Sequence, residues 1–200
     1  PNSALYWKRL NIIIVADLHL GKSISFAKQK QFLPPYDTKE TLEKLFDCIN
    51  EFKPSKLIIV GDLLHDKFSF QSFHHSDLNN LNNSTNKTEF IWVKGNHDSD
   101  VEINGFTKVL DYKVDDIIFN HIPIKTTNYQ ICGHYHPKAK ILHRGKSIYK
   151  TAFVHNDKVL ILPSFGILTG GLNINQEPLK KLLGKNINIF PVNDEKVYKL

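Results

Sequence analysis

The chain has 200 residues, of which 41% are hydrophobic and 23% are charged, and it includes ten glycines and nine prolines. This composition excludes collagen-like, coiled-coil and wholly disordered chains, and the length fits one domain spanning residues 1–200. Lysine and arginine outnumber aspartate and glutamate by 26 to 20, which gives a net charge of +6. The excess favours approach by polyanions, but the basic residues are scattered along the sequence, which is more typical of a solvated surface.

No apolar run approaches the ~18 residues of a membrane-spanning helix, and the opening residues lack the basic and apolar regions of a signal peptide. The sequence therefore predicts a cytoplasmic protein with no membrane partner. Cys48 and Cys132 are too few for a disulfide framework or a four-thiolate zinc site, so we expect buried free thiols.

The first part of the chain is predicted to alternate strands and helices. A β-branched run at 11–15 is typical of a strand buried on both faces. Asp37 and Glu40 have the spacing of a capping box, and apolar residues at helical spacing follow until Pro54. A second apolar run at 57–60 completes a strand–helix–strand unit, which implies a right-handed parallel crossover.

The later elements are predicted to be shorter. Residues 66–88 indicate a helix that passes into an asparagine-rich stretch, and 90–93 form a third apolar strand. A mostly antiparallel half follows, with a helix at 177–183 and hairpin turns at Arg144-Gly145 and Asn156-Asp157. Its expected strands are 117–119, 129–132, 139–143, 148–154 and 158–162, with edge strands at 187–190 and 197–200.

Potential metal ligands follow the apolar strands, at the point where each strand ends. Polar groups at the carboxyl ends of neighbouring parallel strands converge on one crevice, so residues far apart in the sequence can share a site. The residues at these strand ends are Asp17, His19, Asp62, Asn96, His97, Asp98, His121, His134 and His136.

The residue types indicate the kind of ion. Carboxylate and amide oxygens mixed with imidazoles suit a pair of divalent transition metals, namely manganese, iron, zinc or nickel, better than calcium or magnesium alone. In Asp-x-His and His-x-His on extended backbone, alternate side chains lie on the same face and can both point into the crevice. Glycines precede Asp62, Asn96 and His134, where a chain that turns tightly beneath a metal has no room for a Cβ.

In this order, the motifs resemble those of the calcineurin-like metallophosphoesterases: Asp-x-His, Gly-Asp, Gly-Asn-His-Asp, a lone His and Gly-His-x-His, all within residues 17–136. Three stretches, at 17–22, 33–38 and 162–171, look most like the bacterial DNA-ligase-associated metallophosphoesterase and its archaeal relatives. The resemblance implies an α/β (α+β) fold, a β-sandwich of two mixed sheets flanked by helices.

The resemblance also implies a role for each motif residue. Asp62 would bridge two metals, and His97 would contact the scissile phosphate and protonate the leaving oxygen, with Asp98 orienting its ring. The first metal would be bound by Asp17, His19 and His136, and the second by Asn96, His121 and His134. The sequence after Asp62 lacks the Asp-Arg-Gly typical of protein serine/threonine phosphatases, which disfavours a phosphoprotein substrate.

Several neighbouring residues allow more than one interpretation. His65 follows Asp62 by three residues and could support the metal ligands. Lys22 could meet a substrate phosphate or be solvated, and Tyr135 could stack on a base or cover the site. A substrate loop or a plain turn would fit 169–171. The other histidines, His74, His75, His143 and His155, are expected to have no role in the site.

The leading hypothesis is a phosphodiesterase or nuclease that uses two divalent ions, with manganese favoured, and acts on nucleotides or nucleic acid. A link to DNA repair would make a DNA ligase or a helicase a partner. A phosphomonoesterase or pyrophosphohydrolase of a small metabolite is the alternative, because one dinuclear centre can serve all three reactions. A non-catalytic scaffold is disfavoured by the complete set of ligands.

Overall fold

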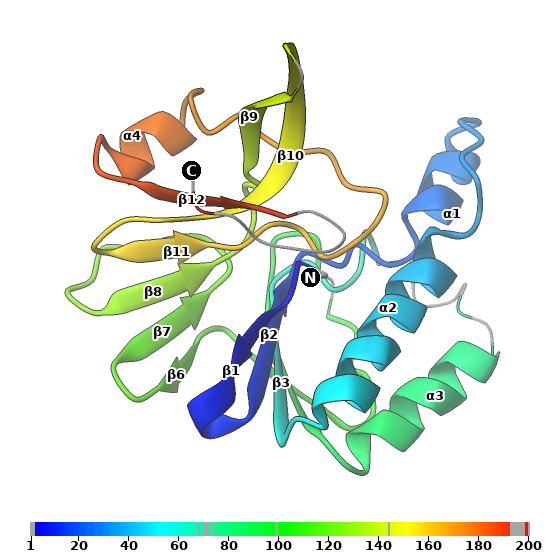
Figure 1. Cartoon of the computed structure of the whole chain (residues 1–200). Helices are drawn as coiled ribbons and strands as arrows, with labels where there is room; N and C mark the ends of the chain where they lie inside the picture. The colour runs from blue at the N-terminus through cyan, green and yellow to red at the C-terminus, as the bar shows by residue number, and fades with distance from the viewer. Residues whose placement is uncertain are drawn as a thin grey trace.

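The computed structural model describes residues 3–67, 69, 73, 75–98, 100–143, 145–192 and 199. Two β-sheets pack against each other, and helices cover their outer sides (Figure 1). The expected fold class, a sandwich of two mixed sheets flanked by helices, is confirmed. That the chain acts as one domain stays a prediction.

The first sheet has five strands in the order β1-β2-β3-β4-β5. β1 is antiparallel to β2, and the other neighbours are parallel. The parallel register places the carboxyl ends of β2, β3 and β4, and with them three ligand loops, at one edge. The strands are β1 (Leu5–Trp7), β2 (Ile12–Ala16), β3 (Lys56–Val60), β4 (Glu89–Val93) and β5 (Phe106–Val109), with a 3₁₀ turn at Lys8–Leu10.

Helices cover the outer face of this sheet (Figure 1), and they are α1 (Lys22–Lys28), α2 (Asp37–Phe52) and α3 (His75–Thr85). Alternate residues of β2 enter two different cores. Ile13 packs with Leu42 and Leu45 of α2, whereas Ile14 packs with Phe119 of the second sheet. Burial on both faces explains why the run at 11–15 contains no polar alternation.

The second sheet has seven strands, six of them in the order β12-β10-β11-β8-β7-β6, and β9 pairs with β10. Its outer pairs are antiparallel, but β7, β8 and β11 are parallel. Two more ligand loops, after β7 and β8, therefore share an edge. The elements are β6 (Tyr112–Val114), β7 (Ile117–Asn120), β8 (Tyr129–Cys132), β9 (Lys138–His143), β10 (Lys146–His155), β11 (Val159–Ile161), β12 (Asn188–Pro191) and α4 (Leu179–Leu183).

Four short elements were not predicted, namely β1, α1, β5 and β6. Each has seven residues or fewer and too few apolar positions to show a periodicity. Both hairpins are confirmed by the β9–β10 and β10–β11 pairing. The expected strand at 197–200 falls largely outside the described residues, as do His74 and several neighbours within 66–88.

Cys48 and Cys132 are buried and free, as expected. Within the described ranges, no helix combines the length and the apolar character that a bilayer crossing requires.

Asp37 does not cap α2, so the capping-box prediction is wrong. The residue before the helix is Tyr36, and the helix start has no side-chain cap. The Asp37 carboxylate instead accepts hydrogen bonds from the Ser23 backbone N–H, at 3.1 Å, and from the Ser23 hydroxyl. Asp37 thereby joins the start of α2 to α1, which follows the first ligand loop directly.

We predict that Asp37→Ala lowers the free energy of unfolding by about 1–3 kcal/mol, because the buried Ser23 N–H would lose its acceptor. The control is Glu40→Ala at the exposed second position of the supposed box, which should change stability by less than about 0.5 kcal/mol. Urea denaturation measures both. Equal losses of unfolding free energy in the two variants would support the capping box predicted from the sequence.

Candidate metal centre

The five ligand loops meet where the carboxyl ends of the central strands of both sheets come together. Hydrogen bonds between the loops hold them in place. The His19 backbone N–H donates to the Asp62 carbonyl at 2.9 Å, and the Gly133 N–H donates to the His121 carbonyl at 3.1 Å. The His134 N–H donates to Asp17 Oδ2 at 2.8 Å, which joins the first sheet to the second.

Asp17, His19 and His136 form one group of potential ligands. His19 Nε2 lies 3.3 Å from His136 Nε2, which in turn lies 3.5 Å from Asp17 Oδ2. Asp17 and His19 are buried, and His136 is partly exposed. The two imidazoles come from positions 117 residues apart in the sequence.

The second group gathers around His121 Nε2. Asn96 Oδ1 lies 2.7 Å from this nitrogen, His134 Nδ1 lies 3.1 Å from it, and Asp62 Oδ2 lies 3.4 Å from it. On the other side of the ring, His121 Nδ1 lies 3.5 Å from Asp17 Oδ1. Neither of these two buried atoms has a hydrogen-bond partner among the described residues.

Asp62 lies between the two groups. Its Oδ1 accepts a hydrogen bond of 2.9 Å from the His97 backbone N–H. Its Oδ2 is 3.8 Å from His19 Nε2 and 3.4 Å from His121 Nε2. One oxygen of the carboxylate is therefore fixed by the backbone, and the other faces both groups, as a bridging ligand requires.

Burial sets the charge of these side chains. It lowers the pKa of His19 to about 2 and the pKa of His121 to about 4, so both imidazoles are neutral near pH 7. A neutral imidazole offers the lone pair that a metal ion needs. Burial also raises the pKa of Asp62 to about 6, because its carboxylate has lost most of its contact with water.

These residues fit a pair of cations. Asp17 Oδ1 is buried and has no hydrogen-bond partner among the described residues, and several nitrogen and oxygen acceptors face one another in each group. Acceptors at such distances repel unless a proton or a cation lies between them. Two divalent ions would satisfy all of them at once.

The backbone at the ligands is strained. Five of the seven predicted ligands have a positive φ, between 35° and 71°, and they are Asp17, His19, Asp62, His134 and His136. Such conformations cost of order 1–3 kcal/mol each and persist only where the surroundings enforce them. Their concentration at one site indicates that the loops are held in shape for binding.

Glycines allow the loops to approach one another this closely. Gly61 has a φ of 80°, and a Cβ there would lie 1.8 Å from His121 Nδ1. A Cβ at Gly95 would lie 2.2 Å from the Asp62 backbone nitrogen and 2.2 Å from its Oδ1. The reason proposed for these glycines from the sequence, absence of room for a Cβ, therefore holds.

A family model described as calcineurin-like phosphoesterase matches residues 10–186. The chain belongs to this family. Members of the calcineurin-like phosphoesterase family use a dinuclear metal centre, in agreement with the two candidate groups. The protein is therefore a phosphoester hydrolase.

The chain is similar to two solved structures. A nuclease MPE from Pseudomonas putida is 24% identical with a TM-score of 0.77, over 100% of this chain and 92% of that chain. Yfce, a phosphoesterase from E. coli, is 13% identical with a TM-score of 0.44, over 92% of this chain and 88% of that chain. No curated protein matches the chain in sequence.

The structure corrects the predicted role of Asp98. Its carboxylate accepts hydrogen bonds from the Leu64 N–H at 3.1 Å, the Gly95 N–H at 2.7 Å and the Trp92 indole at 2.9 Å. The His97 ring is oriented instead by the His65 carbonyl, which lies 3.1 Å from His97 Nδ1. Asp98 thus fixes the loops after β3 and β4 rather than the ring of its neighbour.

His65 is the best supported of the ambiguous residues. Its ring stacks on His97 with 5.5 Å between centroids and meets His19 edge-on at 5.7 Å. Lys22 is half-buried and lowers the pKa of the nearby His19, although less than burial does. The ring of Tyr135 meets His134 edge-on at 4.9 Å, so it covers that ligand.

The three stretches that resemble one subfamily lie around the first ligand loop. The Phe165 N–H donates to the Ala16 carbonyl at 2.7 Å, and the Gly166 N–H donates to the Asp17 carbonyl at 3.2 Å. The Gly21 N–H donates to Thr38 Oγ1 at 2.7 Å. These stretches therefore support the backbone that carries Asp17 and His19.

Lys44 is a supporting residue that the sequence analysis missed. Its Nζ donates a hydrogen bond of 2.8 Å to the Phe165 carbonyl and lies 4.1 Å from the centre of the Phe165 ring. Burial lowers the pKa of Lys44 to about 8. A lysine on the polar side of an amphipathic pattern indicates exposure, so helical spacing alone could not identify this contact.

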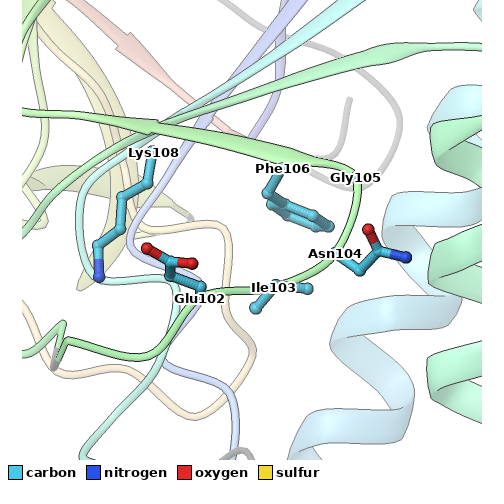
Figure 2. Close-up of a pocket in the computed structure, with 6 residues that line it drawn as sticks. All are labelled: Glu102, Ile103, Asn104, Gly105, Phe106 and Lys108. Atoms are coloured by element: carbon cyan, nitrogen blue, oxygen red, sulfur yellow. The ribbon is translucent and has the colours of Figure 1, made fainter.

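A cavity of about 520 Å³ lies away from the ligands, along the loop before β5 and on β5 itself (Figure 2). Glu102 and Lys108 lie at one end of it and Asn104 at the other. None of the nine predicted site residues lines it. The chemistry is therefore assigned to the strand-end loops and not to this cavity.

We predict that Gly95→Ala weakens Mn²⁺ binding about 10–100-fold, because the added methyl group would displace the Asp62 carboxylate. Gly170→Ala is the matched control, since a Cβ there would meet nothing within 4 Å. Calorimetric titration with Mn²⁺ measures both, and circular dichroism checks that each variant folds. Full Mn²⁺ affinity in a folded Gly95→Ala protein would show that the close approach of Gly95 to the Asp62 carboxylate is not needed for metal binding.

Proposed function

We propose that the protein is a phosphodiesterase that hydrolyses phosphodiester bonds in nucleotides or nucleic acid. The observation that carries the proposal is the pair of ligand groups sharing Asp62, with the exposed His97 beside them. The similarity in fold to a protein described as a nuclease supports the same substrate class.

The metal ions are proposed to be manganese, since each group mixes carboxylate or amide oxygens with imidazole nitrogens. One ion would be held by Asp17, His19 and His136, and the other would be held by Asn96, His121 and His134. Asp62 would bind both ions. When bound, such a pair stabilises phosphoryl charge and lowers the pKa of a water nucleophile.

His97 is proposed to protonate the leaving oxygen. Its Nδ1 faces the His65 carbonyl, which can only accept, so Nδ1 carries a hydrogen and Nε2 is the nitrogen available for substrate. The ring is exposed and lies 5.3 Å from the His19 ring, centroid to centroid. It can therefore contact a substrate bound at the metals without being a ligand.

We predict that His97→Ala keeps the bound Mn²⁺ but lowers turnover by about 10²–10⁴-fold, the usual contribution of a general acid. His75→Ala, at an exposed position on α3, is the matched control and should retain full turnover. Metal analysis and initial rates test the two variants together. A metal-free His97→Ala protein would show that this residue is a ligand.

The resemblance of the stretches at 17–22, 33–38 and 162–171 to the DNA-ligase-associated subfamily supports a narrower form of the proposal. In this form the protein processes DNA during repair in the cytoplasm, with a DNA ligase or a helicase as partner.

The choice between a diesterase and a monoesterase can be tested with two chromogenic substrates in Mn²⁺. We expect hydrolysis of bis(p-nitrophenyl) phosphate and little or none of p-nitrophenyl phosphate. Asp62→Asn provides the blank, because it removes the shared carboxylate. The opposite preference would favour a phosphomonoesterase of a small metabolite.

A further inference from the structure

We propose that the β9–β10 hairpin is a ribbon that binds the phosphate backbone of a nucleic-acid substrate beside the metal centre. The proposal rests on the proposed function, since it assumes that the substrate is a polymer. It adds a binding surface outside the ligand loops.

The hairpin begins next to the site. β9 starts at Lys138, two residues after the predicted ligand His136. Its tip projects beyond both sheets (Figure 1). Six residues of β9 at about 3.3 Å each give a reach of roughly 20 Å, or about six base-pair steps of a duplex.

The base of the hairpin is firmly attached. The Lys138 N–H donates to the Leu172 carbonyl at 2.8 Å, and the Ile174 N–H donates to the Lys138 carbonyl at 3.1 Å. The lower half of β10 also pairs with β11 and β12. A ribbon fixed at its base can hold a bound strand in a defined position relative to the metal ligands.

The charge of the hairpin is entirely positive. Residues 138–155 contain four lysines, Arg144 and no aspartate or glutamate. Among the described residues, none of the lysines forms an ion pair, and they are Lys138, Lys140, Lys146 and Lys150. A polyanion would therefore find cations that are not already neutralised.

Apolar and aromatic groups lie among these cations. Tyr149 is opposite Lys140, and Ser147 is opposite Leu142, so the four share one face of the ribbon. Tyr149 is 53% exposed and Leu142 is 78% exposed. Lys140 thus lies beside an aromatic ring that can stack on bases, and a cation beside an exposed aromatic ring is typical of single-strand binding surfaces.

Charge complementarity selects nucleic acid as the occupant. The cations lie on both faces of the ribbon, with Lys140 on the face of Tyr149 and with Lys146 and Lys150 on the other face. Phosphates can therefore contact the ribbon from either side, and the ribbon begins beside a site for phosphoester hydrolysis. A small diester would reach the metal centre without touching the ribbon. The binding of a polymer and the hydrolysis of a small diester can therefore be separated by mutation.

The test is the triple variant Lys140→Gln, Lys146→Gln, Lys150→Gln. The control triple, Lys39→Gln, Lys53→Gln, Lys87→Gln, removes the same charge from exposed positions on and beside α2 and α3. Binding of fluorescein-labelled DNA of roughly 20 nucleotides is measured by anisotropy, single-stranded and duplex. All proteins carry Mn²⁺ and His97→Ala, so that the DNA stays intact.

We expect the ribbon triple to raise the Kd for DNA by about ten-fold or more at about 0.1 M salt. The slope of log Kd against log salt should fall by about 2–3, because three phosphate contacts are lost. The control triple should change neither. An Lys→Arg triple at the ribbon positions should restore binding and thereby exclude a folding defect.

With His97 intact, the ribbon triple should hydrolyse bis(p-nitrophenyl) phosphate at the wild-type rate and DNA more slowly. Equal DNA affinity in the ribbon triple and the control triple would overturn the proposal that the ribbon binds nucleic acid. Absence of DNA binding by the His97→Ala protein with all its lysines intact would overturn it too. Loss of binding in the ribbon triple would support it even if the wild type cleaved no DNA. In that case the proposal that the protein hydrolyses DNA would be wrong, whereas the proposal that the ribbon binds DNA would be supported.

Discussion

The arrangement depends on the position of one buried carboxylate. Asp62 is held by the His97 backbone N–H through one oxygen, and its other oxygen faces both groups of imidazoles. Because the two sheets contribute different histidines, this position requires their strand ends to meet. Gly95, after β4, leaves the space in which the carboxylate lies, and Gly61, before Asp62, leaves the space for the His121 ring. The ligand positions at the site therefore depend directly on how the two sheets pack.

The strain in the ligand loops is offset by bonds from outside them. Asp98 accepts three N–H groups and so joins the loops after β3 and β4. On the other side, residues 165 and 166 support the first ligand loop, and Lys44 holds the Phe165 carbonyl. Positive φ values at the ligands are thus maintained by a shell of backbone hydrogen bonds, which allows the side chains to be in place before any ion binds.

Much of the fold could be predicted because long apolar runs report burial directly. The three buried parallel strands, the long helix and both hairpins followed from local pattern. The short elements β1, α1, β5 and β6 did not, since a few residues carry no readable period. At Asp37 the pattern was misleading, because a capping residue and a residue that bonds a neighbouring helix look alike in sequence. The contacts of Asp98 could not be predicted for a related reason: its partners lie in strand β4, in the loop after β4 and in the loop after β3.

The sequence by itself determined which residue types end the strands, in what order, and that carboxylates and imidazoles together suit a pair of transition metals. Only the tertiary structure decided which Asp62 oxygen faces the ligands and which group orients His97. The physical reason is the distance along the sequence between the residues in contact. Periodicity records the burial of each element, whereas contacts such as His19 with His136, 117 residues apart, depend on strand order and register that are set when the two sheets pack.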